Sequence, residues 1–123
     1  MKIYPSILTH DLEVAQEQLA LSQELSGVDT VQFDVIDGDY VDNLTLAPTA
    51  LAELEYGELK VDLHLMVNEP LDFVYEARDM AKQLPVRAII AQIERMSDQM
   101  SYVEEVRRNN WQVGLSLDLY TPL

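Results

Sequence analysis

Two stretches decide the fold: residues 30–36, TVQFDVI, and residues 60–67, KVDLHLMV. Both alternate with a period of two, which is the side-chain period of a β-strand. The apolar face consists of Val31, Phe33, Val35, Val61, Leu63, Leu65 and Val67, whereas the opposite face carries Gln32, Asp34, Asp62 and His64. A parallel sheet that is covered by helices on both faces has strands that are apolar throughout. Polarity on one face only therefore predicts a barrel-type sheet, with its helices outside and its polar groups inside.

Similar runs recur along the chain and are separated by segments of helical period. The other three predicted strands are residues 2–8, 87–93 and 112–119, and the predicted helices fall within residues 12–19, 48–56, 71–81 and 96–106. Repeated strand and helix units with short connections give a parallel sheet with right-handed crossovers. We therefore expect an α/β fold with about five parallel strands and four helices, as part of a TIM-type barrel.

Composition excludes several classes of protein. The 8 Lys and Arg residues against 22 Asp and Glu residues give a net charge of −14, which is unsuited to binding the phosphates of nucleic acids. A hydrophobic content of 48% predicts a folded core, and the lack of cysteine excludes disulfides and thiolate metal sites. With no long apolar run, residues 1–123 are expected to form a single cytoplasmic domain without a signal peptide or membrane anchor.

The candidate functional residues lie near the carboxyl ends of the predicted strands, where barrel enzymes have their active sites. Asp34 and His64 fall there on neighbouring strands. Such a pair can hold a divalent metal or move protons, and it is equally compatible with two inward polar groups that satisfy each other. Ser6 either binds substrate or caps local backbone. The acidic residues of the predicted helices, such as Glu104 and Glu105, are expected on a solvated outer face.

Several motifs, taken together, resemble one known family. They are Ile3-Tyr4-Pro5-Ser6-Ile7-Leu8, Phe33-Asp34-Val35-Ile36-Asp37-Gly38, Asn43-Leu44-Thr45, Val61-Asp62-Leu63-His64-Leu65-Met66, and Gly114-Leu115-Ser116-Leu117-Asp118 with Thr121-Pro122-Leu123. In this order they are similar to the ribulose-phosphate 3-epimerases of the pentose phosphate pathway. Each motif alone is modest, but their shared register over the whole chain makes the match specific.

The resemblance implies a (β/α)8 barrel that interconverts ribulose 5-phosphate and xylulose 5-phosphate by moving a proton at C3. Two carboxylates act on opposite faces of a planar enediolate, and a divalent metal (Zn, Fe or Mn) held by two His and two Asp stabilises the oxyanion. By resemblance, Asp34 would be a proton carrier and metal ligand, and His64 a second metal ligand. Ser6, His64 and Met66 would contact the phosphorylated ketopentose.

Departures from the family pattern bear on activity. The family's other metal-binding His aligns with Gln32, a poorer ligand, and a further His aligns with Gln92. The family's Met in the second strand is Ile36, and its Asn in the fifth strand is Asp118. A complete barrel of this kind has roughly 200–250 residues, so strands six to eight, the second catalytic Asp and the phosphate loops are expected to be missing.

Three interpretations follow from these departures. The chain is the amino-terminal part of an epimerase, impaired or inactive by itself; a non-catalytic half-barrel that pairs through its open sheet edges, as a homo-oligomer; or one half of an enzyme completed by a separate carboxyl-terminal half-barrel. If the five parallel strands do not close, the inward-facing Asp34, Asp62, His64 and Asp118 are expected to be open to water.

Overall fold

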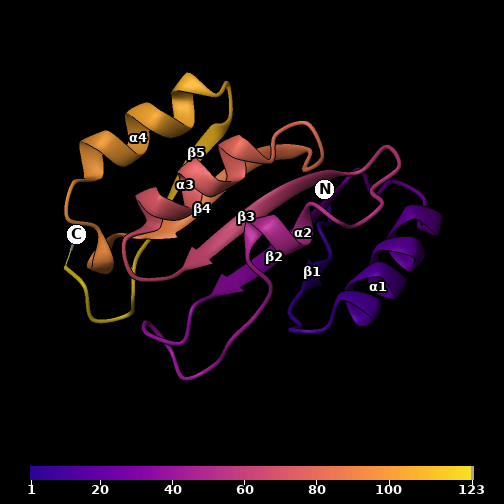
Figure 1. Cartoon of the computed structure of the whole chain (residues 1–123), viewed down its shortest axis with the longest axis horizontal. Helices are drawn as coiled ribbons and strands as arrows, with labels where there is room; N and C mark the ends of the chain where they lie inside the picture. Colours follow the sequence, from indigo (N-terminus) through magenta and orange to yellow (C-terminus); the bar gives the residue numbers. More distant parts are fainter. Residues whose placement is uncertain (123) are drawn as a thin grey trace.

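The computed structural model describes residues 1–122 and contains a five-stranded parallel sheet with the order β1-β2-β3-β4-β5 (Figure 1). The elements are β1 (Ser6–Ile7), α1 (Leu12–Glu24), β2 (Thr30–Ile36), α2 (Pro48–Leu51), β3 (Lys60–Met66), α3 (Pro70–Asp79), β4 (Val86–Gln92), a 3-10 turn η1 (Ile93–Arg95), α4 (Gln99–Arg108) and β5 (Gln112–Ser116). The strands pair in chain order and a helix follows each of the first four, which is the arrangement of a TIM-type barrel. The predicted α/β partial barrel is confirmed.

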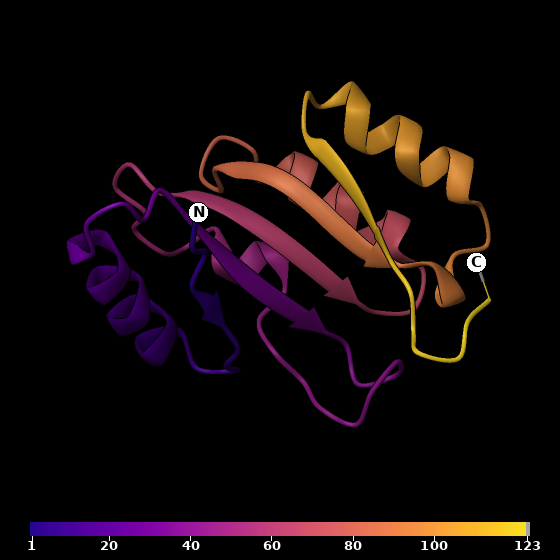
Figure 2. The same ribbon diagram turned by 180° about the vertical axis from the view of Figure 1, so that it is seen from behind.

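The helices lie on one side of the sheet, and the view from behind shows the strands uncovered (Figure 2). The side beneath the helices holds the core, which includes Val31, Phe33, Val35, Val61, Leu63, Leu65, Ile89 and Ala91, all 2% exposed or less. The other side, which we call the open face, carries Ser6, Gln32, Asp34, Asp62, His64 and Gln92. The alternation in the sequence therefore predicted correctly which residues face the helices.

The outer strands are shorter than predicted. Residues 2–8 were expected in the first strand, but β1 contains only Ser6 and Ile7, because it pairs on one side only and Pro5 has no N–H to donate. The last strand ends at Ser116 instead of residue 119, because its neighbour β4 ends at Gln92 and gives way to the 3-10 turn. Leu123, the final residue of the last family motif, lies outside the described residues.

All four helices begin or end differently from the prediction. Helix α1 continues to Glu24 rather than residue 19, and α2 ends at Leu51 rather than residue 56. Helix α4 starts at Gln99 rather than residue 96, because the Asp98 side chain accepts the Ser101 N–H and caps the helix. Helix α3 runs over Pro70–Asp79 instead of residues 71–81, with proline in the first turn, where its missing N–H costs no helical bond. None of the helices within residues 1–122 is long and apolar enough to cross a bilayer.

Two acidic side chains are buried, contrary to expectation. Glu105 is 3% exposed rather than solvated, and its carboxylate pairs with Arg78 and Arg108. Asp62 is 5% exposed rather than open to water, because Arg87 Nε donates to Asp62 Oδ1 at 3.0 Å and the guanidinium makes a second contact with the same carboxylate. Both carboxylates are thus paired, as buried charges must be.

Candidate functional site

Asp34 and His64 meet on the open face, towards the carboxyl ends of β2 and β3. They are direct partners in the parallel register, and Asp34 Oδ1 lies 3.4 Å from His64 Nδ1. Their side chains are 14% and 22% exposed, so solvent and a small ligand can reach them. The structure therefore brings together the two residues that the sequence singled out, at the carboxyl ends of the strands, where barrel enzymes place their active sites.

Three polar groups surround the Asp34 carboxylate. Beside His64, the Gln32 side chain donates Nε2–H to Asp34 Oδ1 at 3.1 Å, and the Ser6 hydroxyl lies 3.4 Å from Asp34 Oδ2. The hydrogen bond from His64 is the main influence that lowers the pKa of Asp34; Gln32 and Ser6 contribute to the lowering, and burial opposes it. Asp34 is consequently ionised at neutral pH and available as a proton acceptor.

The opposite edge of the His64 ring faces β4. His64 Nε2 lies 3.2 Å from Gln92 Oε1, and Gln92 Nε2 donates to the Tyr40 hydroxyl at 2.8 Å. The bond to Asp34 is the largest influence on the pKa of His64 and raises it, Gln92 raises it further, and burial opposes both. Both ring nitrogens of His64 thus have a polar partner.

Sequence reasoning missed Tyr40 and the role of Thr45, which both belong to the loop between β2 and α2. The Thr45 hydroxyl donates to the Asp34 carbonyl at 2.6 Å and accepts the Ile36 N–H at 2.9 Å, which fixes the backbone that carries the Asp34 side chain. In the sequence, Thr45 stands out only as part of a family motif, and nothing in the spacing along the chain places Tyr40 beside β4.

The remaining candidate, Met66, stands nearer the end of the sheet. Met66 is the last residue of β3, partly buried, and pairs in register with Ile36 on β2. It shares a face with His64, two positions further along the strand.

The residues present do not make up a complete metal site. Within residues 1–122, no group of three or more His, Cys, Asp or Glu side chains is placed to hold an ion. Asp34 and His64 supply two donors, whereas Gln32 directs its amide N–H, and not its oxygen, at Asp34. A zinc-like ion takes about four ligands, so this set does not fit one by itself.

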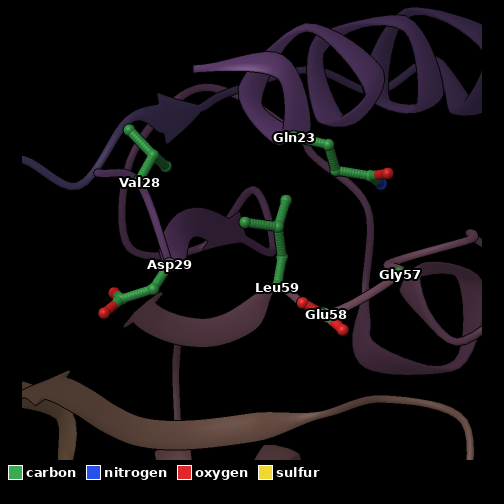
Figure 3. Close-up of a pocket in the computed structure, with 6 residues that line it drawn as sticks. All are labelled: Gln23, Val28, Asp29, Gly57, Glu58 and Leu59. Atoms are coloured by element: carbon green, nitrogen blue, oxygen red, sulfur yellow. The ribbon is translucent and has the colours of Figure 1, made fainter. Parts of the chain in front are cut away.

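A separate pocket lies at the opposite end of the sheet, where β2 and β3 begin. It is lined by Gln23, Val28, Asp29, Gly57, Glu58 and Leu59 (Figure 3). It shares no residue with the cluster around Asp34 and His64. Because parallel-barrel enzymes react at the carboxyl ends of their strands, this pocket is not part of the candidate active site.

Comparison with known proteins places these residues in context. The model of the "Ribulose-phosphate 3 epimerase family" matches residues 2–123. The chain is 30% identical to the ribulose-phosphate 3-epimerase of Rhodospirillum rubrum over 128 residues, which cover 100% of this chain and 53% of that protein. It is 44% identical over 72 residues to the Escherichia coli K12 ribulose-phosphate 3-epimerase, which cover 57% of this chain and 31% of that protein. It is 34% identical over 71 residues to the Bacillus subtilis ribulose-phosphate 3-epimerase, which cover 57% of this chain and 32% of that protein. The chain thus spans about half, or less, of the length of these relatives.

Proposed function

Because the chain belongs to the ribulose-phosphate 3-epimerase family, we propose that it carries the amino-terminal half of a cytoplasmic site for C3 epimerisation of ribulose 5-phosphate and xylulose 5-phosphate. The observation that carries this proposal is the Asp34–His64 contact at the carboxyl ends of two adjacent strands on the open face. An ionised carboxylate with an imidazole, a hydroxyl and an amide around it is equipped to take and return a proton.

The proposed reaction starts with Asp34 removing the proton from C3, next to the C2 carbonyl. The C3–H bond breaks, its electron pair forms the C2=C3 double bond, and the carbonyl π pair moves to the C2 oxygen. The resulting enediolate is planar at C3, so a proton returned from the opposite face inverts that carbon. Asp34 is deprotonated at neutral pH, as the first step requires.

Ser6, His64 and Met66 are proposed to contact the sugar. Ser6 and His64 already flank the Asp34 carboxylate, so they are within reach of a ligand whose C3 approaches Asp34. Met66, at the end of β3, would provide an apolar wall for the plane of the enediolate.

The other half of the proposed site comes from outside the described residues. Returning a proton to the second face requires a second acid. The substrate phosphate requires an anion-binding site, and a net charge of −14 on this chain repels a phosphate. The chain spans about half the length of the Rhodospirillum rubrum relative. A carboxyl-terminal half-barrel, docked against the edges of β1 and β5, would supply both groups.

A one-sided experiment tests Asp34 without that second half. Ribulose 5-phosphate is incubated with the chain in D2O, with and without added divalent metal, and deuterium at C3 is followed by NMR. Exchange needs only removal and return of the proton on one face. Asp34→Asn should abolish the exchange, whereas the matched control Asp42→Asn, an exposed residue of the next loop, should leave it unchanged. Exchange that survives Asp34→Asn would exclude Asp34 as the proton carrier.

A second candidate function is a non-catalytic half-barrel that assembles through its sheet edges. The observations in its favour are the single-sided pairing of β1 and β5, and the apolar side chains exposed in β5 and just after it, with Leu115 51% and Leu119 84% exposed. Unpaired strand edges invite a further strand. Sedimentation at micromolar concentration tests it: a stable folded monomer would count against this function, and a defined oligomer without isotope exchange would favour it.

A further inference from the structure

The loop after β2 brings Tyr40 to β4, far from its own strand. Gln92 is 6% exposed at the end of β4, and its amide connects the Tyr40 hydroxyl, at 2.8 Å, with His64 Nε2, at 3.2 Å. Arg95 lies over the Tyr40 ring, 5.8 Å from its centroid. Tyr40, Gln92 and His64 therefore form one polar chain that ends at Asp34.

The position of Tyr40 is fixed by several independent bonds in its loop. Asp37 Oδ1 accepts the N–H groups of Asp39 and Tyr40, and Asp37 Oδ2 accepts the Asn68 N–H at 2.8 Å from the loop after β3. Gly38 has a φ of +88°, a left-handed conformation that the tight turn requires and that glycine adopts without strain. The turn at Asp37 and Gly38 thus directs Tyr40 over the neighbouring strands.

We propose that Gln92 and Tyr40 are positioning residues, which hold the imidazole of His64 in the one ring orientation that places Nδ1 against Asp34. The Asp34–His64 contact of 3.4 Å is long and fixes only one edge of the ring. Gln92 fixes the other edge, and Tyr40 in turn prevents the Gln92 amide from rotating away. This inference rests on the proposed function, since the orientation of His64 matters when Asp34 moves a proton.

The consequence for the proposed reaction is geometric. A catalytic group displaced by about 1 Å can lower a rate by about 10²-fold, although the displaced group keeps its chemistry. The Tyr40 hydroxyl bonds with Gln92 and makes no hydrogen bond with Asp34 or His64, so its effect on exchange at C3 would pass through Gln92 and His64. Loss of its hydroxyl is therefore expected to slow C3 exchange while leaving the fold intact.

The test observes the His64 ring directly by NMR in protein labelled at histidine. The chain has two histidines, and the exposed His10 provides a reference in the same spectrum. In the wild-type chain the ring order parameter of His64 should be about 0.85, as high as that of rigid backbone, and in Gln92→Leu it should fall below about 0.6. Tyr40→Phe, which retains the ring over Arg95, should lower it in the same direction.

Two further variants separate positioning from a general loss of structure. Gln92→Glu keeps oxygens that can accept from both His64 and Tyr40, and should restore a rigid His64 ring. Tyr75→Phe removes a tyrosine hydroxyl from the surface of α3 and should change nothing.

Each outcome decides the proposal. A His64 ring that stays equally ordered in Tyr40→Phe and Gln92→Leu would overturn it; if Gln92→Leu does not fold, Tyr40→Phe decides alone. The measurement needs no turnover, so a chain that fails to exchange deuterium at C3 would refute the proposed function and leave the order of His64 to be judged separately.

Discussion

The ion pair between Arg87 and Asp62 should contribute strongly to stability, and its loss is the perturbation to make first. Asp62 faces the amino-terminal end of the open face, where the β3–β4 register shifts: Val61 pairs with Val86, but Asp62 pairs with Ala88. Arg87 is the extra residue of this bulge, and an extra residue redirects its side chain. The bulge therefore sends a guanidinium onto the buried carboxylate.

The size of the effect follows from the burial of the two partners. The Asp62 side chain is 6% exposed and Arg87 is 29% exposed. Arg87→Met would leave a buried carboxylate without its partner, a loss that costs about 3–5 kcal/mol, and partial access of water to Arg87 favours about 3 kcal/mol. Asp62→Asn should cost less, about 1.5 kcal/mol. In that variant the Arg87 guanidinium is partly solvated, still donates to Gln112 Oε1 at 3.3 Å, and still lies over the Tyr4 ring, 4.9 Å from its centroid.

Urea unfolding followed by the fluorescence of Trp111, the single tryptophan, measures the change in unfolding free energy for both variants. The double variant should show a coupling energy of about 2 kcal/mol, because the amide at position 62 no longer needs the cation. Arg107→Met, an exposed residue of α4, is the matched control and should stay within about 0.5 kcal/mol of wild type. A cost below about 1 kcal/mol for Arg87→Met, or additive single variants, would refute the reasoning.

Four further outcomes are expected. Tyr102→Phe should destabilise the chain by about 1–3 kcal/mol in the same assay, because the single O–H of this buried side chain is shared between the carbonyls of Ile89 in β4 and Gly114 in β5, at 3.0 and 3.1 Å, and the variant loses that donor. Gly114→Ala should cost about 1–3 kcal/mol, since the new methyl group would lie 2.8 Å from Ile90 Cγ1, and Ile90→Ala should recover part of the loss if that contact is the cause. The difference in unfolding free energy between wild type and Asp34→Asn should be largest between pH 3.8 and pH 6.5, the unfolded-state pKa values of the two groups. The lowered pKa of Asp34 gives stability that is lost as pH falls through its folded value, and the raised pKa of His64 gives stability that is lost as pH rises through its folded value. A difference that does not vary with pH would contradict the pairing. Zinc or manganese at micromolar levels should leave Tm unchanged, because the described donors do not complete a site, and a clear rise would show that an ion binds the folded chain.

The parts of the site that the sequence predicted lie on regular strands. Alternation fixes the face of a strand residue, and parallel neighbours bring equivalent positions together, so the pattern of the two strands is enough to pair Asp34 with His64. The parts that the sequence missed come from loops and from irregular pairing. Tyr40 contacts Gln92 across 52 positions of the chain, and no periodicity specifies such a contact.

The sequence by itself determined the layer to which each strand residue belongs, the order of the strands and helices, and the family. These properties depend on short-range patterns of apolar and polar residues, which every strand repeats. Only the tertiary structure decided how the charges on the open face are satisfied. The bulge at Arg87 places a guanidinium against the Asp62 carboxylate. The turn at Gly38 places the Tyr40 hydroxyl within hydrogen-bond distance of Gln92, the residue that contacts His64. Both depend on where a long side chain or a loop ends in space, and that is set by packing between distant segments.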